Sequence, residues 1–313
     1  MTRLICHIGF EKTGSTSIQS FLNQAPNNDD LPWFYPETGK VYDHHFEIAK
    51  LQPDVETLRE RLAIEAKGAE LVVLSSEHFS LCKDQGLIDE YAKVFAPFDS
   101  EIVMYLRDPL DWLRSLYGEY IKWGGHVPIR RFYQVQDWQF NYTRQIKKWV
   151  STFGRENVSV FNYTGIGNVV DHFRSEVLKD NTHKPHASAF KNRSDSLVLL
   201  ELLRKLNSAM PSISTKVMRQ AILVRIEEAQ VQLPEYHWPI GKMITESLEQ
   251  QRDRLNNYLG YSFFETGAYK VVPKNEEAER QLDLMLAEVL QLFSKKDDSA
   301  PENDQNLPVD LPG

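Results

Sequence analysis

Four short runs of apolar and β-branched residues divide the first half of the chain, and each run predicts a buried strand. They occupy residues 4–8, 71–74, 102–106 and 158–161. Between them, apolar residues recur at helical spacing, as Ile18, Phe21 and Leu22 do after the first run. Strands that alternate with helices form parallel sheets covered on both faces, and such sheets bind ligands at the carboxyl ends of their strands. The residues that follow each run are therefore the first candidates for a functional site.

The second half of the chain has a different pattern. After about residue 195 no strand pattern recurs, and the hydrophobic spacing predicts helices over residues 197–206, 217–229, 244–259 and 276–293. We expect one α/β domain over residues 1–294, with a parallel-sheet core over about 1–180 and a helical extension over about 195–294. Residues 295–313 are rich in Pro, Asp, Asn and Gln and have little to bury, so they predict a disordered acidic tail.

Composition and charge exclude several classes of protein. Of the 313 residues 42% are hydrophobic and 26% are charged, which argues against collagen-like, coiled-coil and fully disordered chains. The net charge of -8 gives no indication of a nucleic-acid partner. Cys6 and Cys82 lack the spacing of a zinc site, and we expect two buried thiols. Because no apolar run approaches the ~18 residues of a membrane helix and the first residues lack the pattern of an export signal, we expect a cytoplasmic protein without integral membrane contact.

The first predicted strand leads into a loop of the kind that binds phosphate. Residues 9–17 have the sequence GFEKTGSTS, and an amphipathic helix follows. In such loops backbone N–H groups and the helix dipole hold the anion. The spacing is that of the nucleoside-triphosphate loop, G-x-x-x-x-G-K-[ST], but Ser15 stands where the lysine is expected and Lys12 comes earlier. This displacement favours a 5′-phosphate with one further group attached over a β,γ-phosphate chain. The alternative is an ordinary polar turn that caps a helix.

The third predicted strand ends at a second candidate anion site. Asp108 is a good helix N-cap and Pro109 suits the first helical position, so a helix begins here and Arg107 lies at the carboxyl end of the strand. Ser115 lies two turns into that helix and could share one anion with Arg107. In the alternative interpretation Arg107 pairs with Asp108 or Asp111, and Ser115 lies on a solvated face.

Together the two segments resemble sulfotransferases that use 3′-phosphoadenosine 5′-phosphosulfate (PAPS), with bacterial carbohydrate sulfotransferases among them. The resemblance implies a P-loop-like three-layer α/β fold, with a short parallel sheet flanked by helices. It implies that Arg107 and Ser115 hold the 3′-phosphate, and that no metal is needed. Weaker matches add Tyr163, after the fourth strand, and Arg193 and Ser194, in a late loop, as further cofactor contacts. The implied contacts of the 5′-phosphosulfate are Lys12, Thr13, Gly14, Ser15, Thr16 and Ser17.

The resemblance also implies the reaction. A sulfuryl group would pass in line from PAPS to a hydroxyl or amine of a carbohydrate or small-molecule acceptor, leaving adenosine 3′,5′-bisphosphate (PAP). Lys12 would stabilise the charge that develops on the departing phosphate. The general base is left open among Glu77, His45, His44 and His78, in that order of preference.

Some further questions stay open at this stage. The alternative functions are a P-loop nucleotide kinase, disfavoured because no lysine stands at position 15, and a catalytically silent nucleotide-binding module. A homodimer is left open. Aromatic residues on the segments after the first and third strands form either a platform for the acceptor or part of the core; they are Trp33, Phe34, Tyr35, Trp112, Tyr117, Tyr120 and Trp123.

Overall fold

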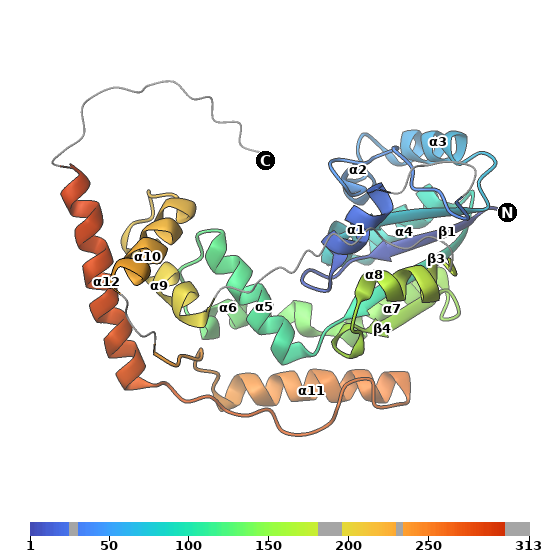
Figure 1. Cartoon of the computed structure of the whole chain (residues 1–313). Helices are drawn as coiled ribbons and strands as arrows, with labels where there is room; N and C mark the ends of the chain where they lie inside the picture. Colours follow the sequence, from blue (N-terminus) through green and yellow to red (C-terminus); the bar gives the residue numbers. More distant parts are fainter. Residues whose placement is uncertain (25–30, 181–195, 230–233, 298–313) are drawn as a thin grey trace. The chain divides into compact units, whose positions relative to one another are not determined.

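The computed structural model describes residues 1–24, 31–180, 196–229 and 234–297 (Figure 1). The chain divides into two compact units. The first, here called the sheet unit, comprises Met1–Tyr117, Arg130–Arg193 and Ile240–Val271. The second, the helical unit, comprises Gly118–Ile129, Ser194–Pro239 and Val272–Gly313. Arg193 and Ser194, which the resemblance implicates in cofactor binding, lie outside the described residues.

The sheet unit is built on four parallel strands in the order β2-β1-β3-β4. They are β1 (Arg3–Ile8), β2 (Leu71–Ser76), β3 (Asp99–Leu106) and β4 (Val158–Asn162), so the four predicted strands and the α/β fold class are confirmed. The chain passes from β1 to a neighbour on one side and then to β3 on the other. The strand order therefore reverses at β1, and the carboxyl end of β1 lies at the point where open α/β sheets bind ligands.

Helices cover both faces of the sheet, because the strands bury side chains on both (Figure 1). On one face, α1 (Ser15–Gln24) and α8 (Val169–His172) pack in a cluster with the strands. On the other face, α4 (Gln85–Phe95) and α7 (Tyr142–Phe153) pack together, and Tyr91 stacks on Trp149. Cys6 and Cys82 are free and buried, as expected. The first cluster includes Ile5, Ile18, Leu22, Val73, Val103, Tyr105 and Phe173.

Polar side chains begin several helices of the sheet unit. Asp54 caps α3 (Val55–Glu65) and Asn141 caps α7, in each case by accepting a backbone N–H bond from the first turn. Asp108 does the same for α5 (Pro109–Lys122), as its position before Pro109 predicts. The remaining elements are α2 (Phe46–Lys50), η1 (Glu77–Leu81), α6 (Ile129–Gln136), η2 (Asp137–Phe140), η3 (Tyr163–Gly165), η4 (Phe173–Val177) and α11 (Lys242–Leu259).

The helical unit contains α9 (Leu197–Ala209), α10 (Thr215–Ala229) and α12 (Glu276–Asp297). Lys205 on α9 pairs with Glu279 and Asp283 on α12 at 2.9 and 2.7 Å. All four helices predicted after residue 195 are present, although α12 continues to Asp297, past the predicted start of the tail at residue 295. The rest of that tail lies outside the described residues. No helix in the described part of the chain has the length and apolarity needed to cross a bilayer.

Candidate functional site

The loop between β1 and α1 is held in place by hydrogen bonds from three side chains, one of its own and two from the region around the start of α5. The carbonyl oxygens of residues 10, 11 and 12 accept hydrogen bonds from Thr13 Oγ1 at 2.6 Å, Trp112 Nε1 at 2.7 Å and Arg107 Nη1 at 3.4 Å. In a trans peptide the N–H group points opposite to the carbonyl. The N–H groups of residues 11–13 are therefore turned away from these anchors, as a loop that binds an anion through its backbone requires.

Two residues of this loop have left-handed backbone conformations. Lys12 has φ 63° and Gly14 has φ 80°. A non-glycine residue in this region costs about 1–2 kcal/mol and persists only where the surroundings enforce it. At Gly14 a side chain is also excluded, because a Cβ atom would lie 2.6 Å from Val169 Cγ1 and 3.3 Å from Tyr163 Cε2. The loop thus combines a strained lysine with a glycine that no other residue can replace without rearrangement.

Gly14→Ala is expected to lower the free energy of unfolding by at least about 2 kcal/mol, from the left-handed conformation and the contact with Val169 together. The matched control is Gly167→Ala, because Gly167 lacks a left-handed φ and has open space around its Cβ position. That control is expected to change stability by less than about 1 kcal/mol in either direction. Urea denaturation of the three proteins measures the difference. Equal destabilisation by the two substitutions would contradict the assigned constraint.

Arg107 lies at the end of β3, and its guanidinium forms no ion pair with an acidic residue in the described ranges. The Asp108 carboxylate accepts hydrogen bonds from the N-terminus of α5 and from the Tyr269 hydroxyl, the latter at 2.7 Å. Asp111 pairs with Arg114 at 3.6 Å. Among the described residues Arg107 forms no ion pair with either aspartate, so the alternative that Arg107 serves only as their partner is wrong. A guanidinium has five N–H donors, and most of those on Arg107 stay available to an anion.

Tyr163 and Ser115 take different positions relative to Arg107. The Arg107 guanidinium carbon lies 5.9 Å from the centre of the Tyr163 ring, and the same ring borders the Cβ position of Gly14. Tyr163 therefore touches both predicted anion-binding segments. Ser115 is half-buried on α5, and no hydrogen bond joins it to Arg107 in the described part of the chain. Its role at the 3′-phosphate stays a prediction.

Glu77 lies beside the first turn of α1. Its two carboxylate oxygens accept hydrogen bonds from Ser15 Oγ at 3.3 Å and from Gln19 Nε2 at 2.9 Å. Gln19 also reaches Ser75 Oγ at 3.3 Å, and Ser75 Oγ lies 2.8 Å from His7 Nδ1. A chain of polar side chains thus runs from Glu77 down between β1, β2 and α1. The sequence pattern did not identify Gln19 or His7 as parts of the site.

His45 is not available as a general base, which corrects one of the predictions. The side chain is fully buried, and both ring nitrogens have partners: Ser75 N–H donates to Nδ1 at 3.1 Å and Nε2 donates to the Pro36 carbonyl at 3.0 Å. Burial lowers the pKa of His45 to about 3, so the ring stays neutral. It fastens the segment before α2 to β2 and has no nitrogen left to accept a proton.

His44 and His78 form a pair next to Glu77. Their rings stack with centroids 5.7 Å apart, and His44 Nδ1 lies 3.0 Å from Ser76 Oγ. Burial lowers the pKa of His78, and its Nδ1 atom is buried without a partner among the described residues. Three of the four candidate bases, Glu77, His44 and His78, therefore lie together at the carboxyl end of β2.

Comparison with known proteins finds similarity among solved structures. No family model and no curated protein sequence matches the chain. In structure the chain is similar to a sulfotransferase from Alicyclobacillus acidocaldarius, with 17% sequence identity and a TM-score of 0.43 over 68% of this chain and 98% of that one. A similarity this distant carries no argument about function. We therefore base the proposed function on the chain's own residues.

Four of the seven aromatic residues considered for an acceptor platform belong to the core, whereas Trp123 is 83% exposed and Phe34 and Tyr120 are half-buried. Trp33, Tyr35, Trp112 and Tyr117 are all at most 3% exposed and belong to the core. Trp112 stabilises the loop instead, because its indole N–H donates a hydrogen bond to the carbonyl of residue 11. With so little exposed surface, Trp33, Tyr35, Trp112 and Tyr117 cannot present their ring faces to an acceptor.

Two tyrosines also belong to the site, and no motif in the sequence identified them. Tyr142, the first residue of α7, donates to the Arg107 carbonyl at 2.9 Å, and Tyr269 reaches the Asp108 carboxylate. Both lie far from residue 107 along the chain, and neither belongs to a motif. A hydrogen-bonding residue on a separate element can be recognised only when the fold brings it to its partner.

Proposed function

We propose that the chain is a sulfotransferase that transfers the sulfuryl group of PAPS to a hydroxyl or amine of an acceptor. The observation that carries the proposal is the hydrogen bond from Arg107 Nη1 to the Lys12 carbonyl at 3.4 Å, which joins two segments 95 residues apart. One segment has the pattern of a 5′-phosphosulfate loop and the other that of a 3′-phosphate site. A donor with phosphate groups on both sides of one ribose requires these two segments to be neighbours.

The donor set of this region fits such a ligand. Among the described residues, the N–H groups of Ser15 and Thr16 have no backbone carbonyl partner, whereas those of Ser17 and Ile18 donate to the Gly14 carbonyl at 3.0 and 3.1 Å. The first turn of α1 also carries the positive end of the helix dipole. Lys12 adds a positive charge on the loop, and Val169 and Tyr163 pack closely against the glycine at position 14. Lys12 and residues 13–17 would hold the 5′ end, and Arg107, with Ser115 and Tyr163, would hold the 3′-phosphate.

The proposed reaction assigns a task to each group. The bound donor supplies the sulfuryl group and a phosphate leaving group. A sulfur–oxygen or sulfur–nitrogen bond to the acceptor forms while the bond to the 5′-phosphate oxygen breaks. The Lys12 ammonium and the N-terminal amides of α1 stabilise the negative charge that grows on that phosphate. Glu77, beside Ser15 in the first turn, accepts the acceptor proton.

Loss of the Arg107 guanidinium is expected to weaken PAP binding by about 10- to 150-fold, as the loss of a hydrogen bond to a charged group implies. Arg107→Ala is compared with Arg61→Ala, which removes an exposed guanidinium on α3. Adenosine 5′-monophosphate lacks the 3′-phosphate, and its affinity is expected to change less than threefold. Calorimetric titration of each protein with both nucleotides gives the four ratios. Equal losses for the two nucleotides would contradict a 3′-phosphate role for Arg107.

The proposal as a whole is tested by ligand choice. PAP at ~100 times its Kd is expected to stabilise the folded chain by about 2.7 kcal/mol in a thermal or chemical unfolding experiment. A larger response to Mg-ATP would assign the site to a nucleotide kinase. PAP binding without transfer of 35S-labelled sulfate from PAPS to a panel of sugars, phenols and amines would assign it to a silent binding module.

A further inference from the structure

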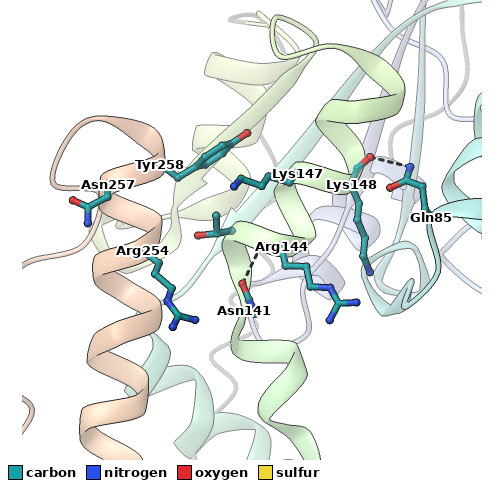
Figure 2. Close-up of a pocket in the computed structure, with 9 residues that line it drawn as sticks. Gln85, Asn141, Arg144, Lys147, Lys148, Arg254, Asn257 and Tyr258 are labelled. Carbon is teal, nitrogen blue, oxygen red and sulfur yellow. Dashed lines mark hydrogen bonds between the residues drawn. The ribbon is translucent and has the colours of Figure 1, made fainter.

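A second candidate site lies between α7 and α11, within the sheet unit. These helices border a cavity of about 690 Å³, and Figure 2 shows the residues that line it. Four of the residues that line it are basic, namely Arg144, Lys147 and Lys148 on α7 and Arg254 on α11, and none is acidic. The chain as a whole is acidic, with a net charge of -8, so this local excess of positive charge stands out from its average surface.

The four basic side chains fall into two groups. Lys148 is structural, because its ammonium donates to the carbonyls of Cys82 and Lys83 at 2.9 and 2.7 Å. Burial and the nearby Arg144 lower the pKa of Lys148, which indicates that positive charge is crowded here. Lys147 lies over the ring of Tyr258 at 5.2 Å, and Figure 2 shows it extending from α7 towards α11.

The cations that face the cavity are not neutralised by neighbouring carboxylates. Arg144, Lys147 and Arg254 are exposed and form no ion pair within the residues that the structure describes. The carboxylate nearest in sequence, that of Asp253, pairs with Arg252 at 3.1 Å. An anionic ligand would therefore meet three positive groups from two helices without first displacing an internal partner.

Neutral hydrogen-bonding groups stand among these cations. The Thr143 hydroxyl is a buried polar atom without a hydrogen-bond partner in the described part of the chain, and it lines the cavity. A buried hydroxyl without a partner costs free energy, and a ligand that bonds to it removes that cost. Asn257 adds an exposed amide, and Tyr258 adds an aromatic ring. This mixture suits a ligand with both negative charges and hydroxyl groups.

We propose that the cleft between α7 and α11 binds an acidic oligosaccharide, with its carboxylate or sulfate groups on Arg144, Lys147 and Arg254 and a hydroxyl on Thr143. The cavity is several times larger than one inorganic anion needs, and its charges are spread over two helices. A long nucleic acid would meet repulsion from the acidic remainder of the chain. The site is separate from the proposed donor site, and its occupancy does not depend on sulfuryl transfer.

Calorimetric titration with tetragalacturonate, which has one carboxylate on each ring, and with its O-sulfated derivative tests the proposal. The fully methyl-esterified tetrasaccharide is the uncharged control ligand. We expect the wild-type chain to bind at least one of the acidic forms about tenfold more tightly than the ester, and the affinity to fall as NaCl screens the charges. The double variant R144Q/R254Q is expected to weaken acidic binding about tenfold.

Matched variants separate this site from general charge effects. R61Q/K67Q removes the same charge from exposed positions outside the cleft and is expected to change the affinity less than twofold. Thr143→Val is expected to weaken binding a few-fold while the circular dichroism melting curve stays that of wild type. PAP binding should be unchanged in R144Q/R254Q; its absence in every protein would count against the donor site and not against the cleft.

Three results would overturn the proposal. One is failure of both acidic tetrasaccharides to bind better than the ester. Another is equal affinity of R144Q/R254Q and wild type for the acidic forms. The third is tighter binding of inorganic sulfate or of a single-stranded oligonucleotide than of either tetrasaccharide, which would assign the cleft to a small anion or to nucleic acid.

Discussion

Replacing Lys12 with glycine is expected to lower the turnover number for sulfuryl transfer by about 100- to 1000-fold, because a charged group aimed at the leaving phosphate is lost. The KM for PAPS is expected to change much less, since the charge on the leaving oxygen develops in the transition state. The same substitution is expected to favour stability. Lys12 has φ 63°, a conformation that glycine adopts freely, so Lys12→Gly is expected to unfold with a free energy about 1 kcal/mol higher than Lys12→Ala.

A second lysine in the same conformation provides the control. Lys179 is exposed and has φ 57°, and it lies outside the proposed site. Lys179→Gly is expected to show the same gain in stability over its alanine variant without any loss of turnover. If Lys12→Gly kept the wild-type rate, the ammonium would have no role in the reaction. A loss of donor affinity as large as the loss of rate would instead assign Lys12 to binding of the ground state.

Glu77→Gln is expected to lower the turnover number by about 10²- to 10⁴-fold, the usual contribution of a general base. The amide has the shape of the carboxylate and can still accept one of the hydrogen bonds from Ser15 and Gln19, so the stability loss should stay near 1 kcal/mol. Glu77→Asp keeps a carboxylate on a shorter stem and is expected to recover part of the rate. Pre-steady-state measurement of transfer gives the rates, urea denaturation gives the stability loss, and PAP affinity checks that the donor site is intact.

His44→Gln and His78→Gln are the comparison variants, because both side chains lie at the same strand end. Each is expected to retain turnover within about tenfold of wild type, since neither would take the proton. A larger loss in either variant, together with an active Glu77→Gln, would transfer the role of base to the histidine pair. His45→Gln is expected to act on stability alone, through the lost bonds to Ser75 and Pro36.

The prediction of strands and helices succeeded because their signals are local. Three of the four apolar runs, in β1, β2 and β3, are buried on both faces, and this burial produces their continuous hydrophobic pattern; β4 is only partly buried. Asp108 and Pro109 mark the start of α5 through groups that act within one helical turn. The general position of the candidate site followed as well, because the carboxyl ends of parallel strands meet at one edge of a sheet.

The roles of individual side chains could not be predicted in the same way. His44 and His45 are adjacent in sequence, yet one is half-buried beside Glu77 and the other is sealed between Ser75 and Pro36. Nothing in the sequence distinguishes them. Trp112 likewise fits an acceptor platform as well as a core position until its contacts are known.

The sequence by itself determined the α/β class, the positions of the four strands and of the four helices after residue 195, and the two candidate anion-binding segments. Those features depend on residues within a few positions of one another. Only the tertiary structure decided that Arg107 bonds to the Lys12 loop, that Glu77 rests on the first turn of α1, and that basic residues of α7 and α11 share a cleft. Each of these depends on which distant residues the packing of the sheet brings together, and on how much water that packing leaves around them.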